Sequence, residues 1–393
     1  MRFAKLAGLM LAAATLSGCA DARSDSAFTR PDGAVLSAQD IRDAIEHHRG
    51  AAGAEGLALA LIADGNVVFA EAFGWRDVAN ELPLQTDTVM HGASLTKAAF
   101  GYMVVQLADE GLIDLDAPIS GILPRPLPEY ERYGDLEGDE RWRLLTPRIL
   151  LSHTSGLPNW RWFLDDQRLV FFFEPGERYV YSGEGLQILQ LALEEGLGLD
   201  IGEEMQARVF DRFGMTRTAM SWREDFADNL AHGYTRDGEY VAYRPRTRVV
   251  VAGSMDTTLD DYAAFLAGLT RREGLSDAAF AELTAPQIAI TSSRQFPSHL
   301  PQDTDENADI GLSYGLGWGI YDTPYGRAIF KEGNEDGTNN YALCLIEAAR
   351  CLLILSNSAR ADSTFLYLAN ALLGETGLPW AWKGYIPYDH PDW

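Results

Sequence analysis

The chain has 393 residues, of which 47% are hydrophobic and 11% aromatic, which is enough apolar side chain for one large core. Its formal net charge is −25 at pH 7. Such acidity argues against nucleic-acid binding, which depends on basic side chains that neutralise phosphates. It also argues against adsorption to anionic membrane surfaces through a basic patch.

Residues 1–18 resemble a bacterial lipoprotein signal peptide. A positively charged start and an apolar run over residues 6–16 precede the sequence Leu-Ser-Gly-Cys19. We expect Cys19 to carry a lipid and residues 19–35 to form a tether, with the protein in the periplasm and attached to the membrane only by that lipid. The apolar run is too short to span a bilayer. The alternative is a signal peptide cut elsewhere, which would leave a soluble periplasmic protein.

The hydrophobic pattern predicts strands near both ends of the chain and helices between them. A helix is expected near residues 38–48, then strands over 57–63 and 67–73 around an Asp-Gly-Asn turn. A mainly helical region runs from residue 94 to about 290, followed by strands near residues 328, 341 and 352 and a helix over 362–373. We expect the first and last segments to share one antiparallel sheet. Residues 36–373 would form one domain, and the aromatic and proline-rich tail over 374–393 would pack on its surface.

Lysine is rare in this chain, and two of its four lysines stand in motifs. Lys97 closes a Ser94-Leu-Thr-Lys97 tetrad, and the apolar residues 98–107 that follow are typical of a helix buried on all sides. Ser94 is expected to cap this helix. Side chains three residues apart share a helix face, so the amine of Lys97 can reach the hydroxyl of Ser94. Burial and a second nearby cation would lower the pKa of Lys97 toward that of a usable base, whereas the alternative is a snorkelling lysine after a serine cap.

Several further segments, in order along the chain, resemble the serine β-lactamase and penicillin-binding-protein-like family, particularly its class C and esterase-like branch. The segments are Gly111–Pro118, Leu150–Pro158, Glu174–Ser182, Val209–Met215 and Tyr314–Trp318. The resemblance runs from about residue 36 to residue 373. It implies an α+β fold of the β-lactamase/DD-peptidase type, in which helices flank an antiparallel sheet. A mainly helical region is inserted, and the active site lies between the two parts.

The resemblance also implies roles for individual residues. Ser94 would be the nucleophile, and Lys97 would help to deprotonate it. Tyr181 would ionise near two ammonium groups and pass a proton to the leaving group, with a purely structural tyrosine as the alternative. Lys331-Glu-Gly333 would line the site from a strand at the sheet edge, and Gly333 would let a substrate approach the backbone. The oxyanion hole would combine the amides of Ser94 and Asn334.

Two departures from the family pattern concern the substrate. Gly183 stands where an asparagine that contacts a substrate amide is common, and Glu332 replaces a small hydroxyl residue, so that a carboxylate would face the cleft. Both weaken a β-lactam interpretation. The sequence therefore predicts an exported serine hydrolase that forms an acyl-enzyme on Ser94 and hydrolyses a small ester or amide. The alternatives are a D-amino-acid-specific peptidase or β-lactamase acting on cell-wall-type substrates, and a non-catalytic binder of peptidoglycan fragments.

No metal or cofactor is predicted. The seven histidines show no spacing of metal ligands, and the glycines around residue 317 precede no helix that could bind phosphate. His153 resembles a family position that is usually a buried hydrogen-bonding residue. The expected partner is a small-molecule ester or amide, or a peptide.

Cys344 and Cys351 flank a predicted hairpin and could form a disulfide in an oxidising compartment. A three-residue turn at 348–350 would direct their side chains to opposite faces, whereas an even loop would align them. Both outcomes are open from the sequence.

Overall fold

The computed structural model describes residues 27–297, 299 and 302–390. The predicted signal peptide, residues 1–18, and the predicted lipidation site, Cys19, lie outside these ranges. Within them, every helix is too short or too polar to cross a bilayer.

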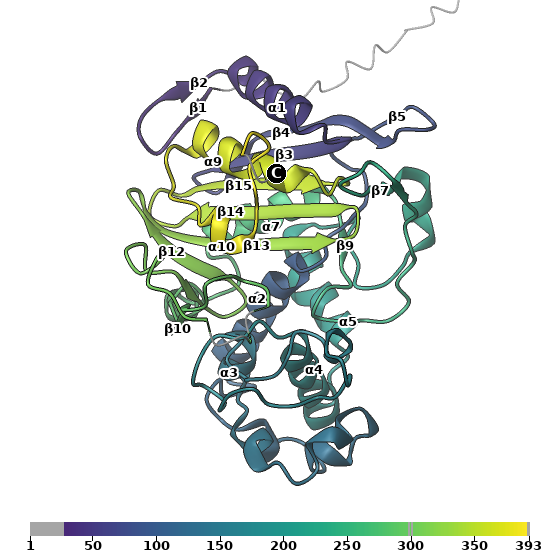
Figure 1. Ribbon diagram of the computed structural model, residues 1–393, viewed down its shortest axis with the longest axis vertical. Helices are drawn as coiled ribbons and strands as arrows, with labels where there is room; N and C mark the ends of the chain where they lie inside the picture. The colour runs from purple at the N-terminus through teal and green to yellow at the C-terminus, as the bar shows by residue number, and fades with distance from the viewer. Residues whose placement is uncertain (1–26, 298, 300–301, 391–393) are drawn as a thin grey trace, which may run out of the picture.

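An antiparallel sheet forms the upper part of the molecule (Figure 1), and its strand order within the described residues is β10-β11-β12-β13-β14-β15-β3-β4-β5. Because β15 pairs with β3, the two ends of the chain share one sheet, as predicted. The strands are β3 (Gly56–Ala63), β4 (Asn66–Asp77), β5 (Leu82–Pro83), β10 (Ile288–Ala289), β11 (Ser313–Tyr314), β12 (Gly319–Thr323), β13 (Gly326–Glu335), β14 (Thr338–Leu345) and β15 (Arg350–Ser356).

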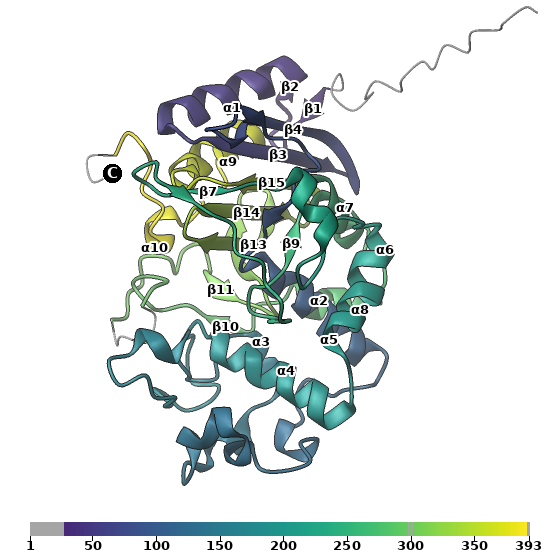
Figure 2. The ribbon, with the colours of Figure 1, turned by 90° about the vertical axis from the view of Figure 1, so that its right-hand side faces the viewer.

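Helices cover both faces of this sheet (Figure 2). On one face lie α1 (Ala38–Ala52) and α9 (Phe365–Leu373), and on the other lie α2 (Leu95–Asp109) and α7 (Leu259–Thr270). The side chains of β3 alternate between the two cores: Leu57, Leu59 and Leu61 pack toward α1 and α9, whereas Ala58, Ala60 and Ile62 pack toward α2 and α7. A strand that is buried on both faces has a continuously apolar sequence, and the sequence of β3 is of this kind.

The region between β5 and β10 is mainly helical, as predicted, and extends below the sheet in Figure 1. Its further helices are α3 (Pro147–Leu151), α4 (Gly183–Leu197), α5 (Ile201–Met205), α6 (Asp211–Phe213) and α8 (Asp277–Leu283). Two short strand pairs join it, β6 (Met90–His91) with β9 (Asp256–Thr257) and β7 (Gly233–Tyr234) with β8 (Tyr240–Val241).

Helix α2 runs through the centre of the molecule, and 13 of its 15 residues are buried. Gly101 in its middle is required by close packing, because a Cβ there would lie 2.5 Å from the carbonyl oxygen of Leu316. The helix begins directly after Ser94, as predicted. Ser94 is nevertheless no side-chain cap: its backbone is already in the right-handed helical region, and its hydroxyl makes no capping hydrogen bond. The hydroxyl is therefore available to Lys97.

The domain extends further at both ends than the sequence suggested. The predicted tether over 19–35 is wrong in its last part, because β1 (Phe28–Thr29) pairs with β2 (Val35–Leu36) and Phe28 is buried. Side chains of the tail also contribute to the core. Leu378, Trp382 and Tyr385 are buried in the same core as α1 and α9, around the short helix α10 (Trp380–Lys383). Burial of large apolar and aromatic side chains holds both segments to the domain.

Cys344 and Cys351 form a disulfide between directly opposed positions of β14 and β15. The strands end at Leu345 and begin again at Arg350, so four residues connect them instead of the expected three. This even loop places both side chains on one face of the sheet.

Candidate active site

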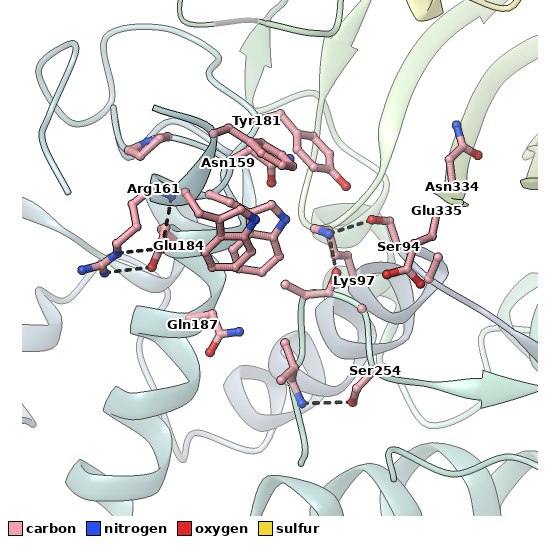
Figure 3. A pocket seen from close by; sticks show the side chains of 18 of the residues that line it. Ser94, Lys97, Asn159, Arg161, Tyr181, Glu184, Gln187, Ser254, Asn334 and Glu335 are labelled. Carbon is pink, nitrogen blue, oxygen red and sulfur yellow. Dashed lines mark hydrogen bonds and ion pairs between the residues drawn. The ribbon is translucent and has the colours of Figure 1, made fainter. Parts of the chain in front are cut away.

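A cavity of about 1770 Å³ opens between the sheet and the helical region, and its walls carry four of the predicted site residues. Ser94 and Lys97 come from the start of α2, Tyr181 from the segment that leads into α4, and Asn334 from the end of β13. Figure 3 shows Tyr181 above the Ser94–Lys97 pair, with Asn334 on the far side of Ser94. Segments that are far apart in the sequence therefore lie around the hydroxyl of Ser94.

The amine of Lys97 is held beside the hydroxyl of Ser94. Lys97 Nζ lies 2.8 Å from Ser94 Oγ and also donates a hydrogen bond to the carbonyl oxygen of Ala252. Only 1% of Lys97 is exposed. Burial, and then the charge of Lys331, hold the pKa of Lys97 well below its usual range, which is the predicted direction. An amine that is neutral in this position is able to accept the proton of Ser94.

Tyr181 is a neutral phenol, so the predicted ionisation of this residue is wrong. Its hydroxyl lies 3.3 Å from Lys331 Nζ, and the amine of Lys97 is 5.0 Å from the ring centre. Burial, followed by the charge of Glu332, nevertheless raises the pKa of Tyr181 well above its usual range, against a hydrogen bond with Ser94. A neutral phenol retains a proton that it can donate.

Glu332 lines the cavity, and both oxygens of its carboxylate accept hydrogen bonds from buried donors. Oε1 accepts from Lys331 Nζ at 2.7 Å and from Gln295 Nε2 at 2.6 Å, and Oε2 accepts from Lys383 Nζ at 2.6 Å. Glu332 is 3% exposed. Burial alone would raise the pKa of this carboxyl, but the two ammonium groups hold it well below its usual range. A buried carboxylate requires such partners.

Lys331 and Gly333 lie on a part of β13 that extends past its neighbour β12. Because the pairing with β12 ends at Phe330, the prediction of an edge position holds locally, although β10 to β12 widen the sheet beyond β13. Packing within the chain requires a glycine at position 333. A Cβ at this position would lie 2.3 Å from the carbonyl oxygen of Gly92 and 3.1 Å from the amide nitrogen of Leu95. This contact brings the end of β13 against the start of α2.

Asn334 follows Gly333, and its side-chain Nδ2 donates to the hydroxyl of Tyr385 at 3.1 Å. The contact of Gly333 with the start of α2 places Asn334 on the Ser94 side of the cavity. The role of its backbone amide in an oxyanion hole stays a prediction.

An aromatic wall takes the place of the family's asparagine at position 183. A Cβ on Gly183 would lie 2.7 Å from the indole of Trp160, so this ring is the reason for the glycine. Trp160 stacks on Trp162 at 4.6 Å between ring centres, and Trp162 and Phe163 are 52% and 69% exposed. Indole rings therefore take part of the space next to position 183, where the family commonly has a polar side chain.

Sequence reasoning missed two ion-pair groups in the cavity wall. Glu184, whose side chain is fully buried, pairs with Arg161 at 2.9 Å and with Arg132 at 3.2 Å. His91 Nδ1 lies 2.6 Å from Glu335 Oε2. The partners are distant in the sequence and belong to no shared motif, so only the fold brings them together.

His153, by contrast, has the environment that the resemblance implied. It is fully buried, and its Nδ1 accepts a hydrogen bond from the backbone amide of Ser182 at 3.1 Å. Burial, then the charges of Lys97 and Lys331, hold the pKa of His153 well below its usual range. A neutral histidine that orients the backbone next to Tyr181 follows from this geometry.

Comparison with known proteins agrees with the geometry. Residues 41–374 match the family model described as Beta-lactamase, and the chain belongs to this family. Its fold is of the β-lactamase/DD-peptidase type.

Three similar proteins illustrate the range of the family. Penicillin-binding protein 4* of Bacillus subtilis (strain 168) is 24% identical over 320 residues, which cover 75% of this chain and 66% of that protein. Lovastatin esterase of Penicillium rubens is 30% identical over 182 residues, 39% of this chain and 45% of that protein. The octameric penicillin-binding protein homologue from Pyrococcus abyssi shares the fold, with a TM-score of 0.70 at 20% identity over 89% of this chain and 80% of that chain. The chain thus spans less than two thirds of the length of either curated relative.

The buried amine gives a first prediction. Because arginine stays protonated, Lys97→Arg should lower the rate at which Ser94 reacts with a fluorophosphonate at pH 7 by about 10²-fold or more. The rate is measured by mass spectrometry of the Ser94 peptide. Thermal unfolding of the variant is recorded in parallel to confirm that it is folded. A folded variant that reacts within about threefold of the wild-type rate would contradict the assignment of Lys97 as the base.

Proposed function

We propose that this protein forms an acyl-enzyme on Ser94 and hydrolyses small esters in preference to β-lactams, with amides as the wider class. The observation that carries the proposal is the buried amine of Lys97, 2.8 Å from Ser94 Oγ and with its pKa well below the usual range. Such a pair activates a serine without a histidine.

The reaction proceeds in two balanced steps. Ser94 Oγ attacks the acyl carbonyl as Lys97 takes its proton, and the amides of Ser94 and Asn334 stabilise the negative charge on the carbonyl oxygen. The alkoxide leaves with a proton from Tyr181, which recovers one from Lys97. Water then attacks the acyl-enzyme as Lys97 takes its proton, and Lys97 returns that proton to Ser94 Oγ as the bond between Oγ and the acyl carbon breaks. The net change is ester and water to acid and alcohol.

The aromatic wall supports an ester with an apolar acyl group. Trp160 and Trp162 line the cavity as a stacked pair, and Trp160 fills the space that an asparagine at position 183 would need. Apolar faces recognise apolar groups, and they offer no partner to the side-chain amide of a β-lactam. The name of the related lovastatin esterase supports an ester as well.

One observation favours a D-amino-acid-specific peptidase as a second candidate. Asn159 lines the cavity near Tyr181 (Figure 3), with its Oδ1 held by the amide of Gly183 at 3.1 Å. Its side-chain amide lies close to the position of the missing asparagine. The name of the related penicillin-binding protein points the same way.

Hydrolysis of a short-chain nitrophenyl ester separates the candidates. We expect turnover by the wild-type protein and a loss of about 10³-fold or more in Ser94→Ala, because the variant has no nucleophile. Ser313→Ala is the matched control, since that hydroxyl donates to the carbonyl of Gly311 and does not line the cavity.

Equal turnover by wild type and Ser94→Ala would contradict the proposal. Turnover confined to peptides that end in D-alanine, together with covalent labelling of Ser94 by benzylpenicillin, would select the second candidate. Binding of peptidoglycan fragments with neither turnover nor a covalent adduct would identify a non-catalytic binder.

We also propose that the protein is exported to the periplasm and anchored by a lipid on Cys19. The sequence Leu-Ser-Gly-Cys19 supports the anchor, and the Cys344–Cys351 disulfide supports an oxidising compartment. Cells supplied with an alkyne-tagged fatty acid should label the wild type and the Cys344→Ser/Cys351→Ser control but leave Cys19→Ser unlabelled. Labelled Cys19→Ser would contradict the anchor.

A further inference from the structure

The C-terminal tail supplies a third lysine to the buried groups behind the active site. All lysines within the described residues, Lys97, Lys331 and Lys383, lie in one buried cluster. The family match ends at residue 374, so Lys383 comes from a segment beyond the matched region. Lys383 therefore lies outside the matched region, behind a site that contains two other lysines.

Lys383 reaches the catalytic groups through Glu332. The two oxygens of the Glu332 carboxylate take one ammonium group each, Lys331 on Oε1 and Lys383 on Oε2. The same Lys331 Nζ lies 3.3 Å from the hydroxyl of Tyr181. A continuous line of polar contacts therefore runs from the tail to the residue that faces Ser94.

The surroundings of Lys383 are aromatic. Its Nζ lies 4.3 Å from the ring centre of Phe330, 5.4 Å from Tyr385, 5.5 Å from Tyr341 and 5.7 Å from Trp382. Cation–π attraction helps to hold the ammonium group there. A buried ion pair is nevertheless no more stable than well-packed apolar side chains in the same space. Stability alone does not account for a charged group in this core.

Lys331, Lys383 and Glu332 form a charged cluster. Its two ammonium groups and one carboxylate leave one net positive charge. Burial lowers the pKa of Lys383 to about 8, against the opposing effect of Glu332, so Lys383 is charged at neutral pH. In the described part of the chain, the charge of Glu332 also shifts the pKa of six side chains that are themselves neutral. They are Tyr179, Tyr181, Tyr314, Tyr341, Tyr385 and His153.

We propose that Lys383 is a positioning residue of the active site. It holds the Glu332 carboxylate between two ammonium groups, keeps Lys331 directed at Tyr181, and keeps the cluster next to Lys97 positive. The role rests on the proposed function, in which Lys97 acts as a neutral base. A positive neighbour favours the neutral amine, and an unbalanced carboxylate favours the protonated one.

Charge-matched variants of the full chain test this role. Lys383→Met leaves Glu332 with a single ammonium partner and the cluster neutral, so the pH at which Ser94 becomes reactive toward a fluorophosphonate should rise by about one unit. Glu332→Gln with Lys383→Met restores one positive charge, and its pH profile should return to within about 0.3 units of wild type. Glu332→Gln alone adds positive charge and should shift the profile to lower pH.

The directions of these shifts in the pH profile distinguish a positioning role of Lys383 from a structural one. If Lys383 only anchors the tail, Lys383→Met lowers the unfolding temperature and leaves the pH profile unshifted. That result, or a double variant that is no closer to wild type than Lys383→Met, would overturn the proposal. Glu332→Gln retains the lysine in the tail, so its opposite shift is measurable even if Lys383→Met fails to fold.

A second readout is independent of catalysis. The chain has four lysines, so protein labelled with ¹³C at lysine Cε gives few resonances, each assigned by its absence from one Lys→Met variant. The Lys97 resonance should titrate at higher pH in Lys383→Met. If it does while Ser94 proves unreactive, the proposed function fails, but the effect of Lys383 on the protonation of Lys97 stands. An unchanged titration overturns that effect, and with it the proposed role, whatever the activity.

Discussion

The structure depends on one buried contact, the amine of Lys97 beside the hydroxyl of Ser94. An amine in the protein interior tends to lose its charge, and the nearby Lys331 strengthens that tendency. Burial of Lys97 requires that α2 be enclosed on all sides, and its 13 buried residues show that it is. The sheet encloses it from one side and the helical region from the other. The cavity opens where these two parts leave Ser94 accessible.

The charges around this contact are balanced against one another. Lys331 lies next to Tyr181, but burial, followed by the charge of Glu332, raises the pKa of Tyr181 and keeps the phenol protonated. Tyr181 can then give a proton to a leaving group while Lys97 takes one from Ser94. The neutral amine of Lys97 then acts as the base and the neutral phenol of Tyr181 as the acid, so neither reacting group carries a permanent charge.

The sequence predicted the features that depend on local spacing. Ser94 and Lys97 lie three residues apart at the start of a helix, and their contact follows from helix geometry. The β3–β4 hairpin and the sheet shared by both ends of the chain follow from alternation and turn residues.

The sequence did not predict charge states and packing contacts that depend on groups from distant segments of the chain. The ionisation of Tyr181 depends on burial and on Glu332, and the neutralisation of Glu332 depends on a lysine 51 residues later in the chain. From the sequence, Gly183 indicated a missing substrate contact, and Gly333 indicated a place where a substrate approaches the backbone. The structure shows that they make room for Trp160 and for the backbone at Gly92. Such packing reasons are visible only once the fold is known.

A crystal structure of the protein inactivated by a nitrophenyl phosphonate would test the account most directly. The account predicts phosphorus bonded to Ser94 Oγ, with Lys97 Nζ beside that oxygen and the phosphoryl oxygen directed at the backbone amides of Ser94 and Asn334. A phosphonate bonded to another residue would contradict the account, as would a phosphoryl oxygen turned away from both amides.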